Sequence, residues 1–203
     1  MHPRLRMALL AAGGIVLATA LAIVLMGAGD EPTANGFDGA TRPPGMPVSD
    51  FALHDEQGEL VRSSSSRGKV TVVTFLYTTC KDTCPIVAQQ IAGALDRLGH
   101  DVPVLAVSVD PANDTPKLAK RFLAVRQLQG RMHFLLGTRA ELAPIWVAYG
   151  IRPQGNGYEH SSHVVLLDRE GRQRVGFPSD RLTPEGLAHD IRRLEAEPSG
   201  SPS

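Results

Sequence analysis

Apolar and polar positions along the chain predict a domain in which strands alternate with helices. Short apolar runs predict strands, and apolar residues at helical spacing predict helices. The expected strands cover residues 70–77, 102–109, 132–136, 164–167 and 174–177. The expected helices cover residues 85–98, 115–125, 140–149 and 184–194. An alternating stretch at 50–61 adds an edge hairpin. This order predicts an α/β sandwich around a mixed sheet, the order of a thioredoxin-like fold.

The first 28 residues predict a transmembrane anchor. No charge occurs between Met7 and Ala28, and about 20 apolar residues suffice to cross a bilayer. Arg4 and Arg6 precede this run, so the positive-inside rule predicts a cytoplasmic N-terminus and an exported domain. A cleaved signal peptide is the alternative, because Ala20-Leu21-Ala22 has the form of a cleavage site. The length of the apolar run beyond that point favours the anchor.

Composition divides the rest of the chain into three parts. Residues 29–46 are rich in Gly, Pro, Asp and Thr, which predicts a flexible tether. Residues 47–197 predict one domain of ordinary size, and residues 198–203 predict a disordered tail. The 21 basic and 21 acidic residues cancel, and no basic stripe is present. Nucleic acid is therefore not an expected partner.

The chain has two cysteines, and they stand close together, directly after the predicted strand 70–77, as Cys80-Lys81-Asp82-Thr83-Cys84. Cysteines four residues apart meet on one side of a helical turn, within the reach of a disulfide. A disulfide that closes so short a loop contributes roughly 2 kcal/mol, which is little for a domain with its own core. A redox or soft-metal site is therefore favoured. Two interpretations stay open for Asp82: it accepts backbone hydrogen bonds within the loop, or it is solvated.

Two thiolates and one imidazole form a three-coordinate site that suits copper, above all Cu(I), and also tolerates zinc. The open position suits the transfer of an ion and does not suit a closed structural zinc site. The helix that begins beside the pair lowers the pKa of the thiols. Five of the seven histidines have no link to the cysteines: His2, His54, His100, His133 and His189. His160 and His163 remain, on the loop that enters the strand at 164–167.

Three segments resemble the Sco/SenC family of membrane-tethered, thioredoxin-like copper proteins. Residues 75–85 (FLYTTCKDTCP) resemble its F-x-Y-T-x-C-x-D-x-C-P signature, and residues 108–116 (SVDPANDTP) resemble its S-V-D-P-x-x-D-T-P segment. Residues 158–171 resemble its histidine, strand and turn. One departure is Lys81, which stands where the family usually has proline. A cation beside two sulfurs stabilises thiolates.

This resemblance implies a metallochaperone that delivers copper, as Cu(I) or Cu(II), to the dinuclear copper site of cytochrome c oxidase. It implies the metal ligands Cys80, Cys84 and His160, because His160 stands eleven residues before the turn at Gly171. His163 is the alternative ligand, and an odd offset along the strand directs its side chain to the opposite face.

The resemblance also implies partners and a location. The partners are the copper-bearing subunit of the oxidase and a thiol reductant or copper donor protein. The location is the inner (cytoplasmic) membrane, crossed once, with the domain in the periplasm or at the cell exterior.

An enzyme is the alternative function. Cys80 and Cys84 would then be the redox pair of a thiol–disulfide oxidoreductase that reduces cysteines of the copper-accepting subunit. The three residues between the cysteines differ from the common C-x-x-C redox loop, which favours the metallochaperone. The two activities are compatible in one protein.

Overall fold

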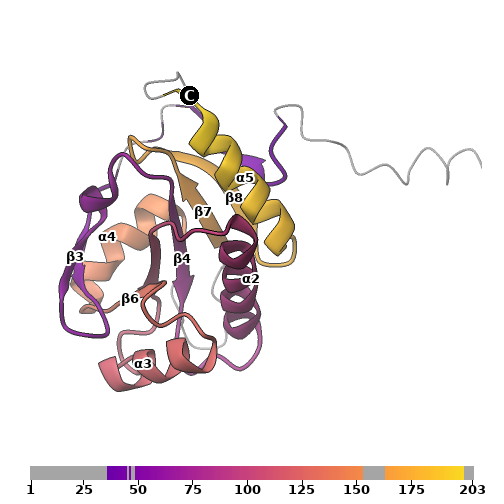
Figure 1. Cartoon of the computed structure of the whole chain (residues 1–203). Coiled ribbons are helices and arrows are strands. Elements are labelled where there is room, and N and C mark those ends of the chain that lie inside the picture. The colour runs from indigo at the N-terminus through magenta and orange to yellow at the C-terminus, as the bar shows by residue number, and fades with distance from the viewer. Residues whose placement is uncertain (1–35, 45, 47–48, 153–162, 199–203) are drawn as a thin grey trace, which may run out of the picture. The chain divides into compact units, whose positions relative to one another are not determined.

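A six-stranded mixed sheet with helices on both faces forms the domain (Figure 1). The computed structural model describes residues 36–44, 46, 49–152 and 163–198. Within these ranges, no helix has the length and apolar character needed to cross a membrane. The predicted anchor and the end of the tail lie outside the described residues.

Two neighbouring inner strands of the sheet are buried along their whole length. In order across the sheet the strands are β1 (Ala40–Thr41), β8 (Gln173–Pro178), β7 (His163–Leu167), β4 (Thr71–Leu76), β5 (Val104–Ser108) and β6 (His133–Leu135). β4, β5 and β6 are parallel, whereas β7 is antiparallel to β4 and forms a hairpin with β8. Every residue of β4 and β5 is buried, as their continuous apolar runs predicted.

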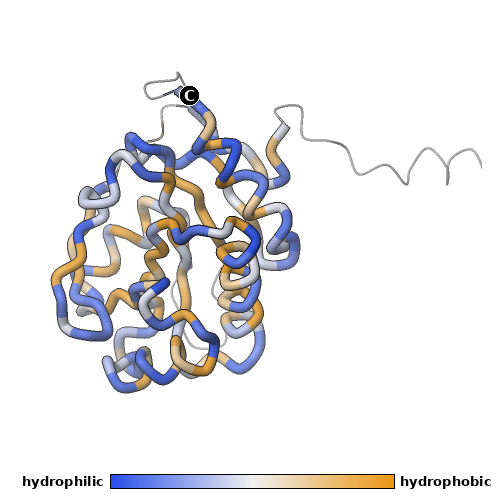
Figure 2. The backbone as a smooth tube through the Cα atoms, viewed as in Figure 1, coloured by the Kyte–Doolittle hydropathy of each residue, from blue (hydrophilic) through white to orange (hydrophobic). Residues whose placement is uncertain are grey.

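Four helices cover the sheet and divide the interior into two cores. They are α2 (Thr83–Leu98), α3 (Pro116–Val125), α4 (Arg139–Tyr149) and α5 (Pro184–Ala196). Buried side chains of α2, α3 and α5 form the first core, which includes both cysteines. Buried side chains of α4 form the second core on the other face of the sheet. Figure 2 shows the apolar segments gathered along the central strands and the helices that face them.

Local signals in the sequence fix where the helices begin and end. The side chains of Thr115 and Thr183 accept backbone N–H bonds and cap α3 and α5, each of which begins with proline. Thr138 and Glu141 form a capping box at the start of α4. Gly150 ends α4 in the left-handed conformation that glycine adopts without strain.

The predicted edge hairpin is present as a separate two-stranded sheet, joined to the chain after β6 by one isolated bridge. It consists of β2 (Ala52–His54) and β3 (Leu60–Arg62), followed by the short 3-10 helix η1 (Ser63–Ser66). The backbone N–H of Leu136 donates to the carbonyl of His54 at 2.8 Å. The hairpin therefore lies beside the carboxyl end of β6 at the edge of the main sheet.

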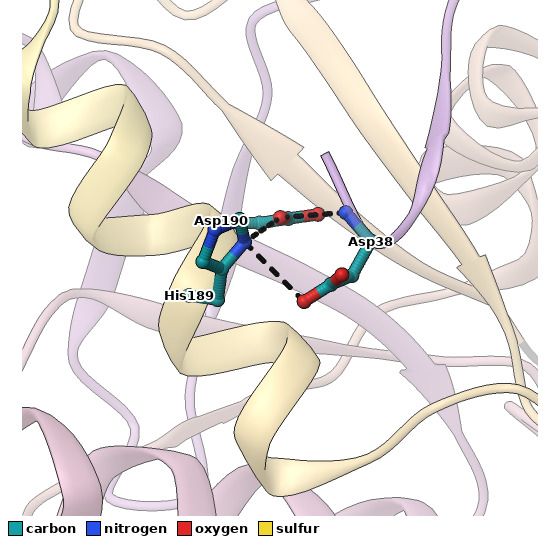
Figure 3. A group of neighbouring side chains, drawn as sticks. All are labelled: Asp38, His189 and Asp190. Carbon is teal, nitrogen blue, oxygen red and sulfur yellow. Dashed lines mark hydrogen bonds and ion pairs between the residues drawn. The ribbon is translucent and has the colours of Figure 1, made fainter. Parts of the chain in front are cut away.

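The end of the predicted tether folds onto the domain. Phe37 is buried in the first core, and β1 pairs with β8. The backbone N–H groups of Asp38 and Gly39 donate to the carboxylate of Asp190 on α5, each at 2.9 Å. His189 Nδ1 lies 2.8 Å from Asp190 Oδ1 and 3.3 Å from Asp38 Oδ2 (Figure 3). The predicted tether, residues 29–46, is therefore too long at its C-terminal end. We call Asp38, His189 and Asp190 the N-terminal clamp.

Candidate metal centre

The two cysteines lie together at the carboxyl end of β4. Cys80 belongs to the loop after the strand, and Cys84 to the first turn of α2. Both side chains are buried, and the two thiols are not joined by a disulfide. The backbone N–H of Cys84 donates to Cys80 Sγ at 3.3 Å. The close pair predicted from the sequence spacing is therefore present.

The two thiols differ in acidity. The Cys84 thiol donates a hydrogen bond to Cys80. Cys80 also accepts hydrogen bonds from the backbone N–H groups of Cys84 and Asp82 and from the Tyr77 hydroxyl. Together these bonds outweigh the effect of burial and lower the pKa of Cys80 to about 5. The same bond to Cys80, together with burial, raises the pKa of Cys84 far above its ordinary value. At neutral pH the pair therefore consists of a Cys80 thiolate and a Cys84 thiol that donates to it.

A half-buried carboxylate, that of Asp114, holds the start of the cysteine loop. Asp114 Oδ1 accepts hydrogen bonds from the backbone N–H of Thr78 at 2.7 Å and from its hydroxyl at 2.6 Å. The hydroxyl of Ser108, at the end of β5, donates to the other oxygen of Asp114. Burial raises the pKa of Asp114. This carboxylate thus ties the loop that leads to Cys80 to the neighbouring strand.

The segment that holds Asp114 also forms a turn and a helix cap. The Asp110 carboxylate accepts two hydrogen bonds from the Asn113 amide, at 3.0 and 2.9 Å, and Thr115 caps α3. The hydrogen bonds from Thr78 to Asp114 were not predicted from the sequence. A threonine just before the cysteine loop is the sequence feature that could have indicated them, but threonine alone does not identify a partner 36 residues away.

Asp82 is exposed and precedes α2 without a capping hydrogen bond from its side chain. Of the two interpretations left open for this residue, the structure supports the solvated side chain. Its contribution to the site is its backbone N–H, which is directed to Cys80. Lys81 is exposed as well.

The predicted histidine ligand, His160, lies in the segment 153–162, outside the described residues. His163 is the first residue of β7 and is half-buried. It alternates in phase with Val165 and Leu167, which belong to the second core, whereas the cysteines belong to the first. His163 is therefore directed away from the cysteine face, as expected from its odd offset. Within the described ranges, its Nδ1 is buried and has no hydrogen-bond partner.

The other described histidines have partners or positions away from the cysteines, as the sequence predicted. His100 Nε2 lies 2.9 Å from Glu195 Oε1, and His133 Nδ1 lies 2.9 Å from Asp55 Oδ2. His189 belongs to the N-terminal clamp, and His54 is an exposed residue of β2. His2 lies outside the described residues.

The donors that the structure brings together fit a soft metal ion. One sulfur atom from the loop and one from the adjoining helix turn lie together, and hydrogen bonds lower the pKa of Cys80, which favours its thiolate form. Sulfur donors favour Cu(I) and zinc over hard cations such as magnesium and calcium. Binding through both sulfurs requires Cys84 to give up its proton.

Comparison with known proteins decides the family. The family model described as SCO1/SenC matches residues 40–196. The chain belongs to the SCO1/SenC family. It is 33% identical over 154 residues to protein SenC of Rhodobacter capsulatus, a match that covers 70% of this chain and 67% of that protein. It is 32% identical over 156 residues to the SCO1 protein homolog of Bacillus subtilis, with coverage of 71% and 81%.

Solved Sco structures share the fold. The structure of Bradyrhizobium japonicum ScoI with copper bound is 33% identical, with a TM-score of 0.62 over 72% of this chain and 98% of that one. The apo Sco1 structure from Thermus thermophilus is 27% identical, with a TM-score of 0.64 over 78% and 96%. These matches confirm the predicted family and the thioredoxin-like mixed α/β fold.

Proposed function

We propose that this SCO1/SenC protein is a copper-binding metallochaperone that acts in the assembly of cytochrome c oxidase. The observation that carries the proposal is the buried thiol pair, in which the backbone N–H of Cys84 donates to Cys80 Sγ. Two relatives support it. ScoI of Bradyrhizobium japonicum has been solved with copper bound, and BsSco is described as a member of the Sco family of cytochrome c oxidase assembly proteins.

Cys80, Cys84 and His160 are the proposed ligands of the transported copper ion. The two cysteines supply soft sulfur donors that favour Cu(I), and an imidazole extends the site to Cu(II), because it is a harder donor. Three protein ligands leave the ion open to attack by the ligands of a recipient, which suits a carrier. His160 is preferred over His163 because His163 shares a face with Val165 and Leu167 of the second core.

The proposed recipient is the dinuclear copper site in the copper-bearing subunit of the oxidase. A thiol reductant or a copper donor protein would restore the carrier after each transfer. The proposed location is the inner membrane, with residues 1–28 as a single-pass anchor and the domain on the periplasmic or outer side. The uncharged run from Met7 to Ala28 supports this location.

The unequal acidity of the two thiols also favours a second candidate function, thiol–disulfide exchange. The Cys80 thiolate would attack a disulfide of the copper-accepting subunit and form a mixed disulfide, releasing one thiolate. Cys84, after losing its proton, would attack Cys80 Sγ and release the second. The substrate gains two electrons, and Cys80 and Cys84 become a disulfide.

Copper binding to the reduced full chain tests the proposed function. We expect one Cu(I) per chain in competition with a chromophoric Cu(I) chelator. Cys80→Ser and Cys84→Ser should each weaken binding by more than a hundredfold, because the two remaining ligands do not hold copper against competing thiols. His189→Gln, in the N-terminal clamp, is the control and should bind as the parent does. Unchanged stoichiometry in either cysteine variant would contradict the proposed site.

The histidine ligand is tested in the Cu(II) state. His160→Ala should lose Cu(II) and its thiolate absorption while it retains Cu(I) through the two sulfurs, and His163→Ala should keep both. The comparison uses electronic absorption and electron paramagnetic resonance of the two variants at equal loading. The opposite pattern would transfer the ligand role to His163.

Disulfide exchange is separated from copper binding by a reductase assay on the oxidised copper-accepting subunit without copper. Turnover that depends on both cysteines and persists in His160→Ala would favour the oxidoreductase. Copper binding without such turnover would support the metallochaperone function and contradict the oxidoreductase function.

A further inference from the structure

A cluster of two carboxylates and one imidazole lies where the turn of the β2–β3 hairpin meets β6. Asp55 and Glu56 follow β2 directly, and they are only 3% and 2% exposed. His133 is the first residue of β6, and its side chain is 52% exposed. One ligand atom from each of the three residues lies within 4.8 Å of the other two. The cluster thus combines buried anions with an imidazole that solvent reaches.

Backbone hydrogen bonds fix both carboxylates and still leave an oxygen of each for a ligand. Asp55 Oδ1 accepts the N–H groups of Gln57 and Glu59, each at 2.9 Å, so Oδ2 is the atom that faces His133 Nδ1 at 2.9 Å. Glu56 Oε2 accepts the N–H of Phe134 at 2.8 Å. Within the described part of the chain, Glu56 Oε1 has no hydrogen-bond partner.

The charges of the cluster are not balanced by the protein. Burial would raise the pKa of Asp55, but hydrogen bonds from His133 and from the turn outweigh it and lower that pKa. Asp55 is therefore ionised at neutral pH. Among the ion pairs of the described residues, Asp55 pairs only with His133 and Glu56 has no pair. A buried carboxylate without a counter-ion is unfavourable, and a bound cation removes that penalty.

We propose that Asp55, Glu56 and His133 form a second metal site, for a divalent ion of the Zn²⁺ or Cu²⁺ type. One nitrogen and two carboxylate oxygens suit these ions and do not suit Cu(I), which prefers sulfur. Water completes the coordination on the exposed side of His133. Binding needs the Nδ1 lone pair, so a proton on Nδ1 moves to Nε2 or to solvent as the metal enters.

The N-terminal clamp also combines two carboxylates with one imidazole, but it is not a comparable site. Both oxygens of Asp190 already accept backbone N–H groups, from Asp38 and Gly39. Both Asp190 oxygens therefore already bind the backbone of residues 38 and 39. His189 serves as a matched control for His133, because both imidazoles are about half exposed.

Zn²⁺ titration of the full chain tests the second site. The double variant Cys80→Ser/Cys84→Ser serves as the parent, so that the thiols take no ion. Isothermal titration calorimetry should show one Zn²⁺ per chain. His133→Gln and Glu56→Gln, made in this parent, should each weaken binding at least tenfold, and His189→Gln should leave it unchanged. Glu56→Gln retains an amide oxygen that can accept the N–H of Phe134.

Electron paramagnetic resonance of Cu²⁺ in the same parent supplies a readout of direct coordination. The spectrum should show nitrogen coupling that disappears in His133→Gln and persists in His189→Gln. Absence of Zn²⁺ binding in the parent, or equal affinity in His133→Gln and Glu56→Gln, would overturn the second site. Neither result would bear on the copper site, since the parent lacks both of its cysteines.

Discussion

At the scale of single residues, two identical side chains four positions apart have opposite chemical roles. Cys80 accepts hydrogen bonds from the Cys84 thiol, two backbone N–H groups and the Tyr77 hydroxyl, which lower its pKa. Cys84 donates its thiol proton in a hydrogen bond to Cys80, and its pKa is raised. The sequence predicted acidic thiols from the adjoining helix start. It did not predict which of the two would be acidic, because that depends on the direction of a hydrogen bond inside the loop.

Alkylation of the reduced chain by iodoacetamide should reveal this difference. Because the thiolate is the nucleophile, the rate at Cys80 should rise as the pH passes about 5 and change little above pH 7. An ordinary thiol instead gains reactivity up to about pH 8.5. Cys84→Ala removes the largest cause of the low pKa of Cys80 and should move its profile upward in pH. Mass spectrometry of tryptic peptides reports each cysteine separately. A Cys80 rate that climbs through pH 8 to 9 would contradict the assignment.

At the scale of elements, the periodic segments were predicted well. All the central strands and the helices named from the sequence are present, with ends within two residues of the structure. Caps and terminators explain this accuracy, since Thr115 and Gly150 act locally. β1 was not predicted because a strand of two residues has no periodicity, and its partner β8 lies far away in the chain.

The N-terminal clamp should contribute measurably to stability. Asp190→Ala removes the acceptor for the N–H groups of Asp38 and Gly39, and we expect it to lower the free energy of unfolding by about 3 kcal/mol. His189→Ala removes an exposed partner and should cost less than about 1 kcal/mol. Urea denaturation followed by circular dichroism measures both. Hydrogen exchange at the backbone amides of Asp38 and Gly39 should accelerate only in Asp190→Ala. Equal stability of the two variants would show that the hydrogen bonds to Asp190 contribute little to the free energy of unfolding.

At the scale of the whole molecule, the candidate site could be predicted only in part. The cysteine pair is close in sequence, so its spacing was enough, and the histidine came from family resemblance. Two contacts were not predicted. The hydrogen bond from Thr78 to Asp114 joins residues 36 positions apart, and the contact of Asp55 with His133 joins residues 78 positions apart. Such contacts follow from how the strands are ordered in the sheet, which no local pattern encodes. His133 was therefore set aside in the sequence, although it lies beside two buried carboxylates.

The position of β1 has a consequence for the order of assembly. Asp38 and Gly39 precede the carboxylate that binds them by 152 and 151 residues. Closing so long a loop is unfavourable until the sheet and α5 have already formed. In a chain synthesised from its N-terminus, the first residues of the domain are therefore made early and join late. β1 and the buried Phe37 are therefore expected to complete the fold after the cysteine loop is in place.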